Sequence, residues 1–105
     1  MDEPTFLRLA DETFKRIEDL FTDVDAEDVD IERTGDTVAL VFRGGKKSVV
    51  NTQRPTRQIW LAANARAWHF SWDDGRQAWL DDKGQGVELF ANIKSIVKEM
   101  AGIEL

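Results

Sequence analysis

The sequence contains no cysteine, and this absence removes several kinds of chemistry at once. Disulfide bonds, thiolate zinc sites, cysteine-held iron–sulfur clusters and cysteine nucleophiles are all excluded. A cysteine-free chain fits a reducing cytosol, so we expect a cytoplasmic protein. The acidic, amphipathic N-terminus is unlike a secretory signal or a transit peptide. No apolar run approaches the length of a membrane span.

The chain is also poor in histidine and in clustered basic residues. His69 is the only histidine, and no nucleophile elbow, glycine-rich phosphate loop or paired metal-binding histidine motif accompanies it. We interpret it as an exposed strand residue, with a metal or partner contact as the alternative. The 20 acidic residues outnumber the 14 basic ones, for a formal charge of −6. This charge argues against nucleic acids and anionic membranes as partners, and in favour of cations or a basic protein.

The residues that are present fit one folded domain with a helix at each end. A chain of 105 residues is long enough for a single domain over 1–105 and too short for two. Apolar residues at spacings of three and four predict a first helix with a stripe from Phe6 to Val24. A similar stripe predicts a second helix from Leu89 to Met100, which Gly102 ends.

Between the helices, alternating apolar and polar residues predict about six short strands. We expect them over 29–34, 37–43, 46–53, 58–62, 68–72 and 77–80, with tight turns such as Gly35-Asp36 and Gly44-Gly45. Such short turns favour antiparallel pairing. The sequence therefore predicts an α+β fold, a two-layer α/β sandwich. Its antiparallel sheet of about six strands has the N- and C-terminal helices packed on one face, which leaves the other face uncovered.

Six of the ten residues in DVDAEDVDIE, Asp23 to Glu32, are carboxylic acids. An EF-hand calcium loop is excluded, because its sixth position should be glycine and is Asp28, and its twelfth should be glutamate and is Thr34. A disordered tail is excluded because Val29 alternates with acids as in a strand. The acids therefore line an ordered surface.

This surface is poorly designed for stability. Glu18, Asp19 and Asp23 are predicted to close the first helix, where negative charge opposes the helix dipole. Asp30 and Glu32 are predicted to project from the first strand, where further like charges repel them. We favour a site for cations or a basic partner over a solvated surface that only confers solubility. Oxygen ligands favour hard or borderline cations, bound weakly and without a permanent cofactor.

A second unusual segment, NTQRPTRQIWLAANA, covers Asn51 to Ala65. If Ile59 and Leu61 face the core, Trp60 points out from the uncovered face of the sheet, among polar side chains. A large exposed aromatic residue ringed by polar groups is typical of an interface anchor. The alternative is a tryptophan packed against its neighbours' side chains.

Three segments resemble bacterial members of the frataxin family. The pattern Asn51-x-Gln53-x-Pro55-x-x-Gln58-Ile59-Trp60-Leu61-Ala62 is similar to its central sheet signature. FLRLAD is similar to the start of its first helix, and HFSWDDGRQAWLD to its fifth and sixth strands. The resemblance implies a frataxin fold and weak binding of Fe²⁺ and Fe³⁺. It also implies docking on the cysteine desulfurase and scaffold protein of iron–sulfur cluster assembly, as a regulator or iron donor.

The resemblance also implies an acidic ridge that meets iron. We use this name for seven residues: Glu18, Asp19, Asp23, Asp25, Glu27, Asp30 and Glu32. We expect partner contacts at a second set: Asn51, Gln53, Arg54, Gln58 and Trp60. A monomer is expected, with iron-induced oligomers as a further state.

Two other functions stay open, namely a ferroxidase acting at the ridge and an acidic adaptor with no metal role. A ferroxidase usually needs a closed carboxylate–histidine site, and the chain has no Glu-x-x-His.

Overall fold

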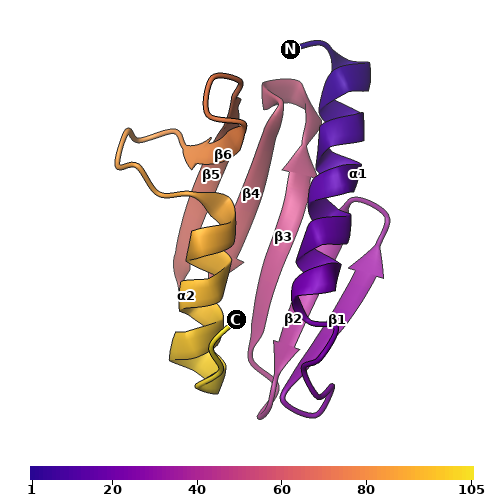
Figure 1. The fold of residues 1–105 in the computed structure, drawn as a ribbon, viewed down its shortest axis with the longest axis vertical. Coiled ribbons are helices and arrows are strands. Elements are labelled where there is room, and N and C mark those ends of the chain that lie inside the picture. The colour runs from indigo at the N-terminus through magenta and orange to yellow at the C-terminus, as the bar shows by residue number, and fades with distance from the viewer.

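The computed structural model describes residues 1–105 as two helices packed on a six-stranded sheet (Figure 1). Each strand pairs antiparallel with the next one in chain order. This confirms the predicted fold class, and the element boundaries agree within two residues except at the end of the first helix. The elements are α1 (Glu3–Leu20), β1 (Val29–Thr34), β2 (Thr37–Phe42), β3 (Lys47–Gln53), the 3-10 turn η1 (Arg54–Thr56), β4 (Gln58–Ala63), β5 (Arg66–Asp73), β6 (Ala78–Asp81) and α2 (Leu89–Ala101).

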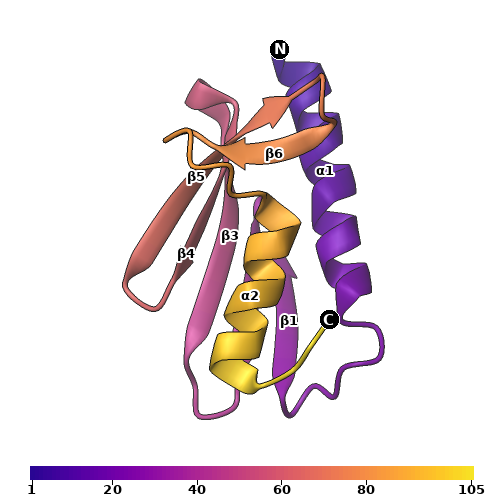
Figure 2. The ribbon, with the colours of Figure 1, turned by 60° about the vertical axis from the view of Figure 1, so that its left-hand side comes forward.

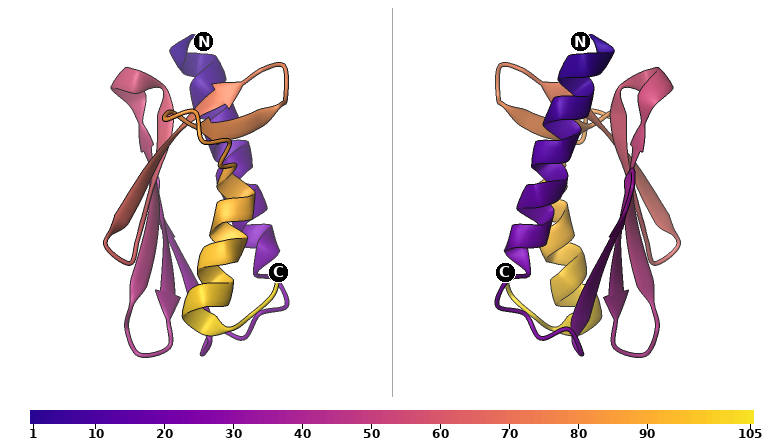
Figure 3. Two further views of the ribbon diagram at one scale, coloured as in Figure 1. Left: turned by 90° about the vertical axis from the view of Figure 1, so that its left-hand side faces the viewer. Right: turned by 90° about the vertical axis from the view of Figure 1, so that its right-hand side faces the viewer.

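Both helices lie on the same side of the sheet, as the two side views show (Figure 3). The sheet twists strongly, so the β5–β6 hairpin curls toward the N-terminal half of α1 (Figure 2). Apolar side chains of the helices and of the inner sheet face form one core of 18 buried residues. Neither helix is long and apolar enough to cross a membrane.

The first helix ends earlier than its apolar stripe predicted. The amide and hydroxyl of Thr22 both donate to the carbonyl of Asp19, at 3.3 and 2.9 Å, and this tight turn stops the α-helical pattern. Val24 therefore lies in the loop after α1, although it still packs against the core. Asp23 also belongs to this loop, so the prediction that it closes the helix was wrong.

One buried hydrogen bond joins the two layers. Trp79 of β6 is almost fully buried, and its indole N–H donates to the hydroxyl of Thr13 on α1 at 2.8 Å. The Thr13 hydroxyl in turn donates to the carbonyl of Leu9 at 2.7 Å. The Trp79 ring also meets the ring of Phe6 edge-on, with the centroids 6.1 Å apart. This contact fixes where the β5–β6 hairpin sits against the helix.

Asp81 organises the loop that leads from β6 to α2. Its carboxylate accepts hydrogen bonds from the amides of Lys83 and Gln85, both at 3.2 Å, and of Val87 at 2.9 Å. Desolvation alone would raise the pKa of Asp81, but these amides stabilise the charged form, and the pKa lies below its ordinary value of 3.8.

We expect Asp81→Asn to lower the melting temperature at pH 7 but not in acid. Because the folded-state pKa is depressed, the stabilisation is present above the unfolded-state pKa of about 4. It is lost as the pH falls through the folded-state value. Thermal melts of both proteins between pH 2.5 and 7 should therefore converge at low pH. Asp23→Asn is the matched control, because the Asp23 carboxylate makes no hydrogen bond. An equal difference at every pH would contradict the prediction.

Candidate functional site

The acidic ridge runs along one edge of the molecule, where the end of α1 lies beside β1 (Figure 1). Residues 18–36 contain nine acids and one base, so this segment carries a formal charge of −8. Since the whole chain carries −6, the remaining residues sum to +2. The negative charge of the protein is thus concentrated at this edge rather than spread over its surface.

The ridge wraps around the edge of the sheet. Val29 is buried beneath the helices and Ile31 packs against the core. The alternation along β1 therefore turns Asp30 and Glu32 toward the uncovered face of the sheet. The ridge residues of α1 and of the loop precede this strand on the helix side. An ion or a partner can therefore approach the ridge from two directions.

Part of the ridge is already neutralised by arginine. The Glu18 carboxylate lies 3.1 Å from the guanidinium of Arg33, which also contacts Asp11 at 2.6 Å. The hydrogen bond from Arg33, helped by one from Lys15, holds the pKa of the Asp11 carboxyl below its usual range. The same bond to Asp11 raises the pKa of Arg33. Sequence reasoning missed Asp11 and Arg33 as members of this edge.

The loop acids have different roles. The Asp25 carboxylate accepts the amide of Glu27 at 2.8 Å and so shapes the turn. Asp28 pairs with Arg43 at 2.7 Å, and this hydrogen bond raises the pKa of the arginine. The other ridge carboxylates have neither an ion pair nor a side-chain hydrogen bond: Asp19, Asp23, Glu27, Asp30 and Glu32. These five are the groups most available to an external cation.

Nowhere in the chain do three carboxylate or imidazole groups gather closely enough to enclose a metal ion. A cation at the ridge would therefore take one or two protein oxygens and keep water on its other positions. Such open coordination suits hard or borderline cations that are exchanged rather than stored.

The second predicted set lies largely together on the uncovered sheet face. Trp60 on β4 stands directly opposite Asn51 on β3 and His69 on β5. Gln53 stands opposite Gln58 two pairs along the same strands. All five side chains alternate with inward-facing neighbours, so they share the face that the helices leave uncovered.

The Trp60 ring is half-buried rather than fully exposed. It stacks on the imidazole of His69, with the centroids 4.1 Å apart and the planes 16° from parallel. Its N–H donates to the Gln58 side chain at 2.9 Å. Gln58 donates to Asp82 at 3.1 Å, and Asp82 lies 3.6 Å from the His69 imidazole. This closed ring of contacts holds Trp60 in one orientation, and it also corrects the view of His69 as a simply exposed residue.

Comparison with known proteins decides the family. A family model described as a frataxin-like domain matches residues 1–103. The chain belongs to the frataxin family. The iron–sulfur cluster assembly protein CyaY of Delftia acidovorans is 39% identical to this frataxin over the whole chain and 96% of the relative. The protein of that name from Pseudomonas fluorescens Pf0-1 is 36% identical over 99% of the chain and 93% of the relative.

Solved structures agree with this assignment. Frataxin from Psychromonas ingrahamii superposes with a TM-score of 0.89 at 27% identity, over 100% of this chain and 96% of the other. Trimeric frataxin from the yeast Saccharomyces cerevisiae, in a ferrous complex, gives a TM-score of 0.70 over 98% of this chain and 88% of the other. At 22% identity, the yeast protein supports the fold alone.

One predicted partner residue of this frataxin lies away from the others. Arg54 is on η1, where its guanidinium lies 3.6 Å from Asp36. It borders a small hollow together with Asp11 and Leu7 of α1, so it lies near the helix side of the molecule. The structure therefore separates Arg54 from the Trp60 face, although the two residues are close in sequence.

Two members of this closed ring of contacts, His69 and Asp82, were not among the predicted site residues. Strand alternation already indicated that His69 points outward, but its pairing with Trp60 depends on the β4–β5 register. Asp82 lies just beyond the end of β6. Its backbone amide donates a hydrogen bond to the carbonyl of His69 at 2.9 Å. No local sequence pattern signals this contact.

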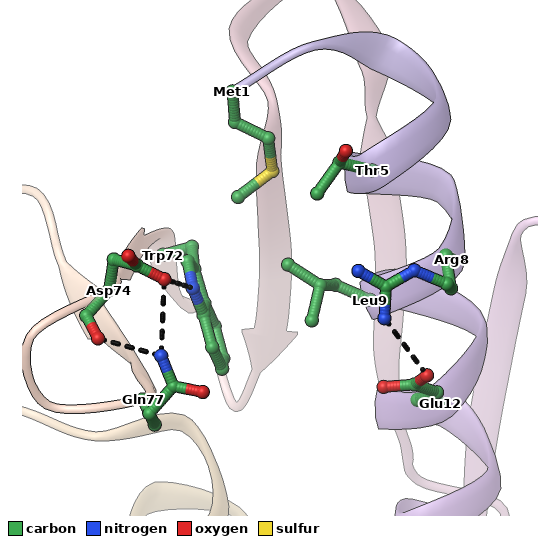
Figure 4. Close-up of a pocket in the computed structure, with 8 residues that line it drawn as sticks. All are labelled: Met1, Thr5, Arg8, Leu9, Glu12, Trp72, Asp74 and Gln77. Atoms are coloured by element: carbon green, nitrogen blue, oxygen red, sulfur yellow. Dashed lines mark hydrogen bonds and ion pairs between the residues drawn. The ribbon is translucent and has the colours of Figure 1, made fainter.

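A hollow of about 560 Å³ lies between α1 and the β5–β6 hairpin (Figure 4). Its polar side chains are mostly paired with one another. Arg8 contacts Glu12 at 3.3 Å, and Asp74 accepts hydrogen bonds from Trp72 and Gln77 at 3.3 and 3.1 Å. The hollow includes no residue of the ridge or of the uncovered sheet face. It therefore gives no reason to place the function of this frataxin there.

Proposed function

We propose that this frataxin serves iron–sulfur cluster assembly as a weak iron carrier that docks on the assembly machinery. The observation that carries the proposal is the set of five unpaired carboxylates along the ridge, in a segment with a charge of −8. The names of the relatives, which call them iron–sulfur cluster assembly proteins, support the same process. Iron is the cargo in this proposal and not a resident cofactor.

The ridge is suited to both kinds of ligand that the proposal requires. Ferrous iron accepts carboxylate oxygens and water, and an open surface lets it exchange quickly. A basic surface, such as we expect on the cysteine desulfurase, would be attracted to the same charges. This attraction accelerates docking and weakens with added salt. Iron and desulfurase should therefore compete for the ridge.

The uncovered sheet face is proposed to meet the scaffold protein. Trp60 offers a half-exposed ring whose orientation is already fixed by His69 and Gln58. A preorganised aromatic residue loses little conformational freedom on binding, which is why such residues anchor interfaces. Asn51 and Gln53 supply amide groups on the same face of the sheet.

Carrier activity is favoured over ferroxidase activity by the geometry of the acids. An oxidase would need several ligands around one or two irons, as in di-iron proteins. The ridge carboxylates do not gather in such a group. An acidic adaptor without a metal role has the same surface, and only a titration with iron separates it from a carrier.

The proposal is tested by nuclear magnetic resonance under anaerobic conditions. Adding Fe²⁺ should broaden the amide signals of residues 18–32 and leave those of α2 sharp, because paramagnetic broadening falls steeply with distance. Adding the scaffold protein should shift the Trp60 indole signal. Potassium chloride at matched ionic strength is the control for a mere salt effect.

Each result separates the candidate functions. If Fe²⁺ broadens no ridge signal, the metal role is wrong and the adaptor is correct. If oxygen is admitted and Fe²⁺ is consumed at a saturable rate that ridge substitutions abolish, the protein is a ferroxidase. An unchanged Trp60 signal would contradict the scaffold contact.

A further inference from the structure

Arg33 occupies an unusual position for an arginine. It lies on β1 in the alternation of Val29 and Ile31, which face the helix layer, whereas Asp30 and Glu32 face away. Its guanidinium reaches α1 and passes over the Phe14 ring, 5.4 Å from the ring centroid. The Arg33 side chain is 27% exposed, against 48% and 41% for the two carboxylates it contacts. It is therefore partly shielded between strand and helix.

The guanidinium bridges two carboxylates that the helix alone keeps apart. Asp11 and Glu18 are seven residues apart on α1, which is about two turns and roughly 10 Å along the axis. Arg33 contacts Asp11 through Nη2 at 2.6 Å and Glu18 through Nη1 at 3.1 Å. Lys15, between them on the helix, also contacts Asp11 at 3.2 Å. One oxygen of the Glu18 carboxylate is thus already paired with a positive group.

We propose that Arg33 acts as a built-in counter-ion that keeps iron away from Glu18 and confines it to the unpaired ridge carboxylates. This inference rests on the proposed function, since it concerns where the ridge accepts iron. A metal ion at Glu18 would meet the positive charge of a guanidinium at close range, and this guanidinium is held in place by two carboxylates. An arginine does not lose its proton in proteins, so changes in pH do not relieve this exclusion.

As a consequence, only part of the acidic ridge binds iron. Iron binds from the last turn of α1 around to the uncovered sheet face, at Asp19, Asp23, Asp30 and their neighbours. The part of α1 that carries Asp11 and Glu18 stays compensated. Arg43 provides the contrast, because it pairs with Asp28 in the loop and touches neither Asp11 nor Glu18. Arg33 alone contacts both Asp11 and Glu18.

The test compares Fe²⁺ titrations of the full chain with Arg33→Gln and Arg43→Gln, under anaerobic conditions. The reporters are the amides of residues 8–14, which lie more than one turn from Asp19. In the unmodified chain the signals of these amides should broaden only at high Fe²⁺ concentration. In Arg33→Gln they should broaden at a roughly tenfold lower Fe²⁺ concentration, as expected for removal of one charge from beside a divalent ion. Arg43→Gln should behave like the unmodified chain at these reporters.

Two further variants keep the test decisive. Arg33→Lys retains a positive charge and should restore most of the exclusion. Arg33→Met retains the aliphatic stem over Phe14, and it replaces Arg33→Gln if that variant melts below the working temperature. If neither neutral variant changes the broadening at residues 8–14 while residues 19–32 still respond, the role of Arg33 is wrong and the carrier function stands. If residues 19–32 fail to respond in the unmodified chain, the proposed function itself is wrong.

Discussion

Replacing Asp19 and Asp23 together by lysine is expected to abolish Fe²⁺ broadening at the ridge and to weaken desulfurase docking on the order of 100-fold. The two changes bring the charge of residues 18–36 from −8 to −4 and remove two of the five unpaired carboxylates. Neither residue holds the fold together through its carboxylate, because neither makes an ion pair or a side-chain hydrogen bond. The affinity for the desulfurase can be followed by isothermal calorimetry at several salt concentrations.

The same variant should melt at an equal or slightly higher temperature. Asp19 lies in the last turn of α1, where a negative charge opposes the helix dipole and a positive one favours it. The variant should therefore bind more weakly while its melting temperature stays equal or rises. This combination is expected for charges that serve binding and not stability. Glu3→Lys with Glu104→Lys is the charge control for docking, since it changes the net charge equally away from the ridge. It is not a control for melting, because these two residues pair with Arg57 and Lys98. Normal docking by the ridge variant would show that the ridge assignment is wrong.

The largest stability effect is expected at Trp79. Trp79→Ala should lower the free energy of unfolding by about 3–5 kcal/mol, as is typical of a large buried aromatic residue. That loss is a large part of the roughly 5–15 kcal/mol by which such domains are stable. The Trp79 ring packs edge-on against Phe6 and also against Trp72, where the ring centroids are 5.3 Å apart. Its removal would therefore leave a cavity between α1 and the β5–β6 hairpin. Urea unfolding followed by circular dichroism measures the loss.

A pair of smaller changes isolates the buried hydrogen bond. Thr13→Val leaves the indole N–H of Trp79 buried without an acceptor, at a cost of about 1–3 kcal/mol. Trp79→Phe removes that donor, while the Thr13 hydroxyl keeps its bond to the Leu9 carbonyl. The double variant has no orphaned donor, so its loss should be smaller than the sum of the two single losses. Strictly additive losses would mean that the bond contributes nothing of its own.

Much of the fold followed from local patterns. The stripe from Phe6 to Ile17 and the alternation around Leu40 and Phe70 each bury one face of an element, and residues at these spacings lie on one side whatever the neighbours are. The end of α1 was misplaced because Phe21 and Val24 continue the apolar spacing into the loop. Phe21 and Val24 pack against the core from the loop and not from a helix. The spacing of apolar residues could therefore not distinguish a continued helix from a loop that packs against the core.

For the candidate site too, some features followed from local sequence patterns and others depend on packing. Sequence alone determined that the acids cluster between the first helix and the first strand, that Trp60 alternates with buried neighbours, and that the chain has no cysteine chemistry. Composition and strand alternation are properties of short segments, so they need no knowledge of distant residues.

Contacts between distant segments determine which of these groups already have partners. Arg33 reaches Asp11 across 22 positions of the sequence, and Trp79 reaches Thr13 across 66. The stack of Trp60 on His69 depends on the register of two strands. Such contacts are set when strands pair and layers pack, because the partners are brought together by the burial of other residues. The sequence therefore placed the ridge acids, whereas packing determined which of them stay unpaired.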